Sequence, residues 1–549
     1  MADEVVLTSL RDVESLRFFH VVCHRDSAAR RLGIDSVRKT FDAWLDGYGS
    51  PRQIYGETGI NGFQPIVTEY LPELLCLSIQ CPFDDVREAL ADILDDVKKR
   101  GRGLQVPRRL EQGASHFISE KEIVPVDTPD DKTRTLFVDA FLQNNRLEHI
   151  TQLMGYHPDY LECFLRTQHY LLKEDGPLPF EYRHYIAIMA AGRHQCSYLI
   201  KLQSHEFLLQ GGDPDWLKGL ERIPRKLKDL NEINKILAHR PWLITKDHIE
   251  KLTRGKDSWS VSEVVHALVI MAQFHALSSF VFGCGINQEV DQDGGYTFRP
   301  PSVSDASEVD YSSDGSSSGE NCSEFEGGGL SVLMEKMRAL TEAREEEMTQ
   351  DELLKRFQHV ESQNALITTN AQPPSPKSDI LCYVDDTTFQ YEDFAKRGSA
   401  SEIPTFRAQD YSWEDQGFSL ANRLYTDVGN LLDEKFNVAY NLTYYTMGDN
   451  TSVDTTAFRR TIWNYIHCMY GIRHDDYNYG EVNQLLERNL KAYIKTVTCY
   501  PERLKKKDYD GVMREFKHSE KVHVNLMLFE ARLQAELLYS LRAVMRHMT

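Results

Sequence analysis

Residues 522–544, VHVNLMLFEARLQAELLYSLRAV, decide the fold class that the sequence predicts. Large apolar residues recur along this stretch at steps of three and four: Val522, Leu526, Phe529, Leu533, Leu537, Leu541 and Val544. Side chains at that spacing share one face of an α-helix. We therefore predict a long amphipathic helix at the C-terminal end of the sequence.

A second long helix is predicted near the middle of the chain. Ser260 and Glu263 form an S-x-x-E capping box directly ahead of the apolar run VVHALVIMAQFHAL at 264–277. Asp213–Pro214 and Thr245 mark two further helix starts, by the residue preferences of the N-cap and first turn. Strand-like alternation bounded by turn residues is scarce, so the predicted fold class is all-α.

The overall composition is that of a folded intracellular protein. Its 549 residues exceed what one core holds, and a hydrophobic content of 41% can bury two or three cores. The formal charge of −20 argues against nucleic acid or an anionic membrane as the main partner. The first residues are acidic, unlike a signal peptide, and no apolar run reaches the ~18 residues of a membrane span.

The cysteines point to a reducing compartment. Ten of them occur singly, with no C-x-x-C pair and no spacing typical of a disulfide framework or a zinc site. We therefore expect a cytoplasmic protein, with the nucleus as a second location, and we predict no metal or other cofactor.

Changes in composition divide the chain into four regions. Residues 1–131 form a helical N-terminal extension, with helix-like stretches at 35–45 and 83–99, and residues 132–286 form a first helical block. Residues 287–388 form an acidic Ser- and Gly-rich linker, too polar to bury a core apart from one charged helix at about 330–363. Residues 389–549 form the second helical block.

Hydroxyl groups and a fixed positive charge surround a short loop in the second block. Thr443, Thr446 and Thr455 flank the polar segment MGDNTSVD, and Arg459 follows it. A free amino acid needs a guanidinium for its carboxylate, a carboxylate such as Glu520 for its ammonium and an apolar wall for its side chain. The loop would serve as a lid. The alternative is that the threonines cap helices and that the arginine is a surface charge.

An acidic pair, Asp475 and Asp476, follows this loop among tyrosines. We expect the pair to be exposed, so that a protein partner can bind it. The alternative is that the two carboxylates begin a helix, where negative charge is favoured by the helix dipole.

The segment YRHYIAIMAAGRHQCSYLIKLQSHEF at 182–207 is predicted to be one largely buried helix. Here the sequence resembles the sestrin family, and the similarity continues through GGDPDWL at 211–217, LAHRPWLITKDHIEKL at 237–252 and SSFVFGCGI at 278–286. It then covers the second block almost to the last residue, and is closest to the one- and three-type sestrins. The resemblance implies two pseudo-symmetric helical halves, each similar to the alkylhydroperoxidase/carboxymuconolactone decarboxylase fold.

The resemblance also implies a chemistry for the first half, which in the family is credited with hydroperoxide reduction by a cysteine, a tyrosine and a histidine on one helix. Cys196 and Tyr198 match the first two. The third position, about two helical turns after the cysteine, holds Gln203, which neither relays a proton nor stabilises a thiolate by charge. His205 points away from that face. The competing interpretation of Cys196 is a buried structural thiol.

For the second half the resemblance implies a leucine site. The residues that match the pocket of the family's leucine sensors are Thr443, Tyr444, Thr446, Thr455, Arg459, Phe516 and Glu520. Two positions differ from the best leucine binder of the family, because Phe458 replaces a leucine and Met513 replaces a tryptophan. Both stay apolar, so we expect a pocket with altered volume and lid contacts.

Asp475, Asp476 and Ser260 match family residues that contact the GATOR complex, which governs Rag GTPase signalling to the target of rapamycin kinase. The resemblance thus implies a stress- and leucine-responsive inhibitor of that signalling, which binds GATOR without ligand and is released by leucine. Two other functions stay open: a cysteine-dependent alkyl hydroperoxide reductase, and a helical scaffold that needs no ligand.

Overall fold

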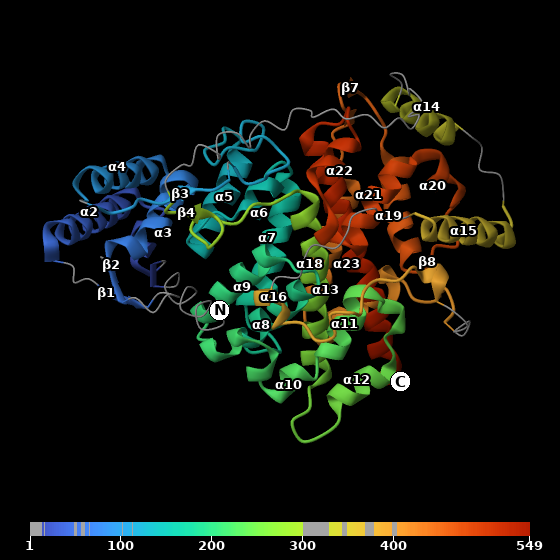
Figure 1. Cartoon of the computed structure of the whole chain (residues 1–549). Coiled ribbons are helices and arrows are strands. Elements are labelled where there is room, and N and C mark those ends of the chain that lie inside the picture. Colours follow the sequence, from blue (N-terminus) through green and yellow to red (C-terminus); the bar gives the residue numbers. More distant parts are fainter. Residues whose placement is uncertain are drawn as a thin grey trace, which may run out of the picture.

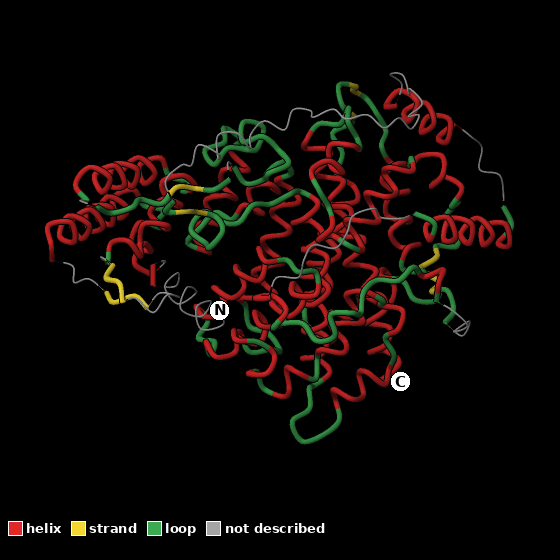
Figure 2. Tube along the Cα trace, in the orientation of Figure 1, coloured by secondary structure: helices red, strands yellow, loops and turns green. Residues whose placement is uncertain are grey.

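The computed structural model describes residues 14–15, 17–48, 52–55, 61–64, 66–101, 103–111, 113–299, 329–342, 348–367, 378–397 and 403–549. Helices make up most of these residues, and strands occur as short pairs (Figures 1 and 2). The all-α prediction is confirmed.

The helices follow one another in four groups along the chain. The N-terminal group is α2 Ser27–Ala43, α3 Val67–Gln80 and α4 Asp84–Arg100. The first block contains α5 Asp131–Asn144, α6 His149–Met154, α7 Pro158–Lys173, α8 Phe180–Arg193, α9 Ser197–Leu209, α10 Arg225–Lys228, α11 Asn231–His239, α12 Lys246–Thr253 and α13 Val261–Gly283. Then come α14 Gly329–Glu342, α15 Gln350–Ala365 and α16 Ser378–Leu381. The second block contains α17 Phe418–Leu424, α18 Val428–Asn441, α19 Thr456–Met469, α20 Gly480–Leu485, α21 Arg488–Cys499, α22 Lys506–Gly511 and α23 His518–Met548.

Four strand pairs connect segments of the described chain. Three are antiparallel: β1 Arg52–Tyr55 with β2 Asn61–Gln64, β3 Arg108–Arg109 with β4 Tyr296–Thr297, and β6 Thr446–Met447 with β7 Asn450–Thr451. The fourth is parallel: β5 Phe406–Arg407 with β8 Ile472–Arg473.

The two helices with the clearest sequence signals, α13 and α23, pack against each other at the centre of the molecule (Figure 1). Arg532 of α23 donates to the Ser279 hydroxyl of α13 at 2.8 Å and to two main-chain carbonyls. Glu536 accepts hydrogen bonds from Arg532 and from His275 of α13, each at 2.9 Å. All four side chains are fully buried, so a polar seam joins the two blocks inside one continuous core.

The helix α13 corrects one expectation from the sequence. An 18-residue window of it has a mean hydropathy of 1.7, so by length and composition it would qualify as a membrane span. All of that window is buried inside the protein, where α13 packs against α23 and α8. Its apolarity on every face is that of a central core helix.

The segment at 182–207 is two helices rather than the single helix predicted. The helix α8 ends at Arg193, and Gln195 adopts a left-handed conformation with φ of 52° before α9 begins at Ser197. Cys196 is the N-cap residue of α9. Gly192 lies inside the last turn of α8 rather than after it, and no proline follows at the break, so the sequence marks this helix end only weakly.

Residues 287–297 also differ from the linker that their composition predicts. Asn287, Glu289, Asp291 and Gln292 are buried, and β4 pairs with β3 of the N-terminal region. In place of the single helix predicted for the linker, the structure has two helices, α14 and α15. The second, α15, begins at a capping box of its own, formed by Thr349 and Glu352. Most of the Ser-rich stretch, residues 300–328, lies outside the described residues.

The helices α2 to α4 of the N-terminal region dock on the first block through polar groups. Arg146 pairs with Asp291 and lies 3.8 Å from Glu73 of α3, all three being buried. Gln80, also of α3, hydrogen-bonds the ring of His149. The extension is thus anchored beside the segment that follows α13.

Candidate functional site

The loop between Thr443 and Thr455, which we call the lid, folds as a hairpin. Its strands β6 and β7 turn at Gly448, where φ is +60°. The Thr443 hydroxyl accepts from the main-chain N–H of Tyr445 at 3.2 Å, and Tyr445 and Ser452 have φ of 53° and 61°. Left-handed conformations at non-glycine residues cost energy, and they gather at sites where function requires them.

Arg459 lies one turn into α19 and is buried, with 6% of its surface exposed. Its Nε donates to the Thr455 hydroxyl at 3.0 Å, its Nη2 to the Thr456 hydroxyl at 3.1 Å and its Nη1 to the Tyr440 carbonyl. These acceptors are neutral, and within the described parts of the chain no carboxylate forms an ion pair with this guanidinium. Desolvation lowers the pKa of Arg459. The Asp454 carboxylate acts on Arg459 only as a longer-range charge outside ion-pair distance, so the guanidinium remains suited to a further anion.

The start of α19 adds to this preference for an anion. Thr455 occupies the N-cap position, but its side chain does not accept from the first-turn N–H groups, because its hydroxyl accepts from Arg459 instead. The Thr456 N–H is already bound by the Asp454 carboxylate at 2.9 Å. The later N–H groups of this first turn are the ones left to bind a ligand carboxylate.

Glu520 supplies the opposite charge at the start of α23. Its carboxylate accepts the main-chain N–H of Gly448 at 2.9 and 3.0 Å, and the Thr446 hydroxyl lies 3.4 Å away. It also accepts the N–H of Lys517 at 2.9 Å in a capping box. The lid is thus closed on Glu520. The three donors make four hydrogen bonds, because the Gly448 N–H is shared by both oxygens, so a ligand ammonium would bind here by sharing or replacing one of them.

The sequence analysis missed a histidine of the first block that reaches this site. His157 Nε2 donates to the Ser519 carbonyl at 2.8 Å, since a carbonyl can only accept, and His157 Nδ1 therefore accepts from the Tyr444 hydroxyl at 3.1 Å. The two rings stack at 5.7 Å, and His523 lies 5.6 Å from His157. His157 is 287 residues from Tyr444, so no local pattern could reveal the contact.

Burial lowers the pKa of His157 to about 4 and that of His523 to about 3. Because these folded-state values lie below the ordinary 6.5, the unfolded chain binds protons first as the pH falls. The stability that the neutral rings contribute is present above pH 6.5 and is lost between pH 6.5 and 4. We expect His157 to account for a loss of about 2 kcal/mol between pH 7 and 5, measured by urea unfolding. A His157→Gln variant should show a flatter dependence, and an unchanged slope would contradict this assignment.

An apolar pair lies beside the charged groups. Phe458 of α19 is buried, and its ring meets that of Phe516 edge to face at a centroid distance of 6.0 Å. Met513 is partly buried and has φ of 48°, in a turn closed by the Phe516 N–H on its carbonyl at 3.0 Å. Phe458 adjoins Arg459 in α19 and Phe516 lies four residues before Glu520, so the contact between the two rings joins the segments that carry the charged groups.

The structure corrects the prediction that both aspartates of the acidic pair are exposed. Asp475 is 1% exposed, and its carboxylate pairs with Arg473 and, at 2.7 Å, with Arg407. These arginines belong to the parallel strands β8 and β5, so Asp475 fastens that strand pair. Asp476 is exposed.

Ser260 lies where the sequence predicts, at the N-cap of α13. Its hydroxyl accepts from the Glu263 N–H at 3.2 Å, and the Glu263 carboxylate accepts from the Ser260 N–H at 2.6 Å. The capping box is confirmed. Within the described residues, no hydrogen bond joins Ser260 to the acidic pair.

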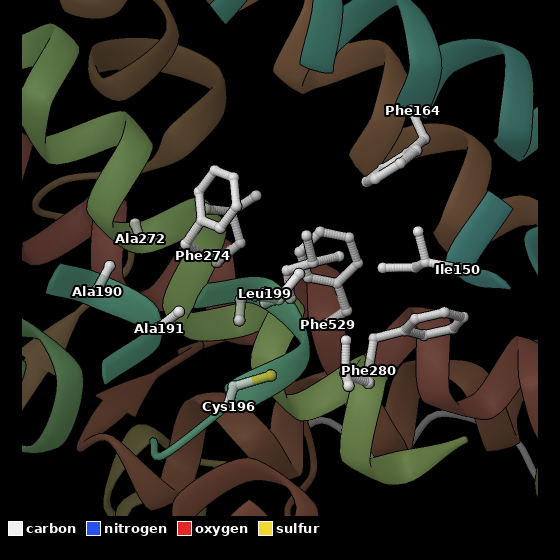
Figure 3. Close-up of a cluster of buried hydrophobic side chains, with 14 of the residues drawn as sticks. Ile150, Phe164, Ala190, Ala191, Cys196, Leu199, Ala272, Phe274, Phe280 and Phe529 are labelled. Atoms are coloured by element: carbon white, nitrogen blue, oxygen red, sulfur yellow. The ribbon is translucent and has the colours of Figure 1, made fainter. Parts of the chain in front are cut away.

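Cys196 is fully buried among apolar side chains, as Figure 3 shows with Leu199, Phe280 and Ala191. Main-chain N–H groups at the start of α9 and the Ser278 hydroxyl favour the thiolate, but desolvation outweighs them and raises the pKa of Cys196 to about 12. A cavity of about 100 Å³ adjoins the residue, large enough for a few water molecules. The thiol is protonated at neutral pH, which suits a structural thiol better than a nucleophile.

The other two positions of the predicted reductase motif are engaged elsewhere. The Tyr198 hydroxyl donates to Glu289 at 2.6 Å. Gln203 Oε1 accepts from the His184 ring at 2.9 Å, and both side chains are buried. His205 is buried too, and desolvation lowers its pKa to about 4. The structure therefore does not bring an imidazole to the Cys196 thiol through these residues.

Fold and site together define a class: an all-α protein whose two helical blocks share one core. The first block holds a buried cysteine, and the second holds a buried guanidinium at the base of a hairpin lid. A family model described as PA26 p53-induced protein (sestrin) matches residues 113–548. The chain belongs to the sestrin family.

Curated relatives agree with the family model. Sestrin-1 of Macaca fascicularis is 54% identical over 461 residues, which cover 81% of this chain and 93% of the relative. Sestrin-3 of Mus musculus is 53% identical over 472 residues, covering 82% and 96%. Sestrin-2 of Homo sapiens is 52% identical over 448 residues, covering 80% and 92%. The helices α2 to α4 lie outside the residues that the family model matches.

Proposed function

We propose that this sestrin is a leucine-responsive inhibitor of target of rapamycin signalling, which binds the GATOR complex without ligand and is released by leucine. The observation that carries the proposal is the buried Arg459, whose guanidinium forms no ion pair with a carboxylate of the described chain. Its guanidinium and the start of α19 suit a carboxylate.

A free α-amino acid fits the surroundings of Arg459 better than a simple anion. Glu520 offers an acceptor for the ammonium, and Phe458 and Phe516 offer an apolar wall. Pairing both ligand charges is what makes their burial favourable. A branched aliphatic side chain needs no polar partner against the wall, which favours leucine.

The test is isothermal titration of the full-length protein with L-leucine and three analogues that each lack one feature. Leucinamide removes the carboxylate, N-acetyl-leucine removes the ammonium, and glycine removes the side chain. We expect binding of L-leucine only. No heat with millimolar L-leucine, or equal affinity for leucinamide, would refute the proposal and favour the ligand-independent scaffold.

The acidic pair gives a separate prediction about the partner. Asp476 is exposed, so Asp476→Asn should weaken capture of GATOR components while leaving the melting temperature unchanged. Asp475 is buried between Arg407 and Arg473, so Asp475→Asn should lower the melting temperature, because it leaves both guanidinium groups without their carboxylate. Pull-downs without leucine, with thermal melts of both variants, check this. Equal melting temperatures together with equal loss of capture would contradict the division of roles.

A further inference from the structure

The helix α14 packs on α19 and α20, on the same side of the second block as the lid (Figure 1). Its apolar residues recur at helical spacing on one face. Leu330 and Met337 on this face are buried, and Leu333, Met334 and Leu340 are partly buried. Val332 and Ala339 face solvent. The helix is thus held by a narrow apolar stripe.

The first turn of α14 touches both the lid and Glu515, the residue before Phe516. A Cβ at Gly448 would lie 3.0 Å from Leu330 Cδ2 and 2.5 Å from the Glu515 carbonyl, so the tip of the hairpin is pressed between them. The Leu330 N–H donates to the Glu515 carboxylate at 3.3 Å. Glu515 directly precedes Phe516.

Opening the lid would therefore disturb α14. The tip must leave Glu520, to which Gly448 donates, and it must leave the Leu330 side chain that covers it. Contacts that form only when the lid is closed add to the stability of the closed state, and a ligand beneath the lid is retained by the same state.

We propose that α14 is a strap that braces the closed lid and thereby strengthens leucine binding. The inference rests on the proposed function, since it needs a ligand beneath the lid. Coupling between two binding events is reciprocal, so leucine must also tighten the docking of α14.

The first test releases the strap by substitution and measures L-leucine affinity by titration calorimetry. The double variant Leu330→Asp/Met337→Asp places charges on the buried stripe, and Val332→Asp/Ala339→Asp places the same charges on the exposed face. We expect the first to bind leucine about tenfold more weakly, with a faster off-rate. The free energy of a tenfold change in affinity is smaller than the free energy that burial of one leucine side chain contributes. The second should bind like the wild type. Equal or tighter binding by the first variant would overturn the proposal.

The second test needs no substitution in the strap. Hydrogen exchange of the wild-type protein, with and without L-leucine, should show added protection across residues 330–341, and an Arg459→Ala variant should show none. Leucine binding without added protection in α14 overturns the strap alone. Absence of leucine binding to the wild type overturns the proposed function, and the strap with it.

Discussion

Replacing Arg459 with alanine is expected to weaken L-leucine binding by at least about a hundredfold. The guanidinium would make charge-assisted hydrogen bonds to the ligand carboxylate, each contributing roughly 1.5–3 kcal/mol, and removing it leaves a desolvated carboxylate without a partner. The protein itself should not lose stability in proportion, because the substitution also removes a buried charge that lacks an ion pair. Titration calorimetry with L-leucine, together with a thermal melt without ligand, measures both effects.

Two variants serve as controls for that experiment. Arg460 is the neighbouring residue, but its side chain is 47% exposed and pairs with Glu481, so Arg460→Ala should bind leucine normally. Arg459→Lys keeps the charge and loses the planar fork, and should bind with intermediate affinity. Wild-type affinity in Arg459→Ala would mean that the carboxylate binds elsewhere.

The second large effect concerns the polar seam between α13 and α23. Arg532→Met is expected to destabilise the protein by about 3–5 kcal/mol, the typical cost of removing one partner from a buried ion pair. Glu536 would lose a hydrogen bond at 2.9 Å, and the Ser279 hydroxyl and two main-chain carbonyls would lose their donor. Chemical denaturation or a thermal melt checks this.

The controls distinguish the ion pair from the position on the helix. Arg546 lies on the same helix and is exposed, so Arg546→Met should change stability by less than about 0.5 kcal/mol. The double variant Arg532→Met/Glu536→Leu should recover part of the loss, since replacing a whole buried pair by apolar groups is often tolerated. Equal melting temperatures for Arg532→Met and Arg546→Met would show that the polar seam contributes little to the stability of the protein.

The sequence predicted those features of the fold that local spacing encodes. The helix α23 was visible from its apolar periodicity, and the start of α13 from Ser260 and Glu263. The break after α8 was not visible, because it depends on Gln195 in a left-handed conformation that residue type does not favour. The burial of Asn287, Glu289 and Asp291 was hidden for another reason: these polar side chains pair with residues distant in the sequence, as Asp291 does with Arg146.

The candidate site likewise contains one contact that the sequence predicts and others that it does not. Thr455 and Arg459 are four residues apart on one helix, so their contact follows from the sequence. Glu520 could be named from the sequence only as a candidate carboxylate, and His157 was missed, because each joins the lid only through tertiary packing. The prediction that Asp475 is exposed was wrong because Arg407 and Arg473, which pair with it, come from two strands whose pairing has no sequence signal.

Because a short connection joins α14 to α15, the concentration of the strap near its docking site is fixed by the chain itself. The last residue of α14, Glu342, is six residues from Met348, and an extended chain spans at most about 3.6 Å per residue, or roughly 20 Å. Because α15, which follows Met348, packs on α19 and α20, a helix α14 that leaves the lid stays tethered to the second block, at an effective concentration in the range of about millimolar. Dilution of the protein cannot disengage α14. A synthetic peptide of residues 329–342 would have to be present at about that concentration to replace it.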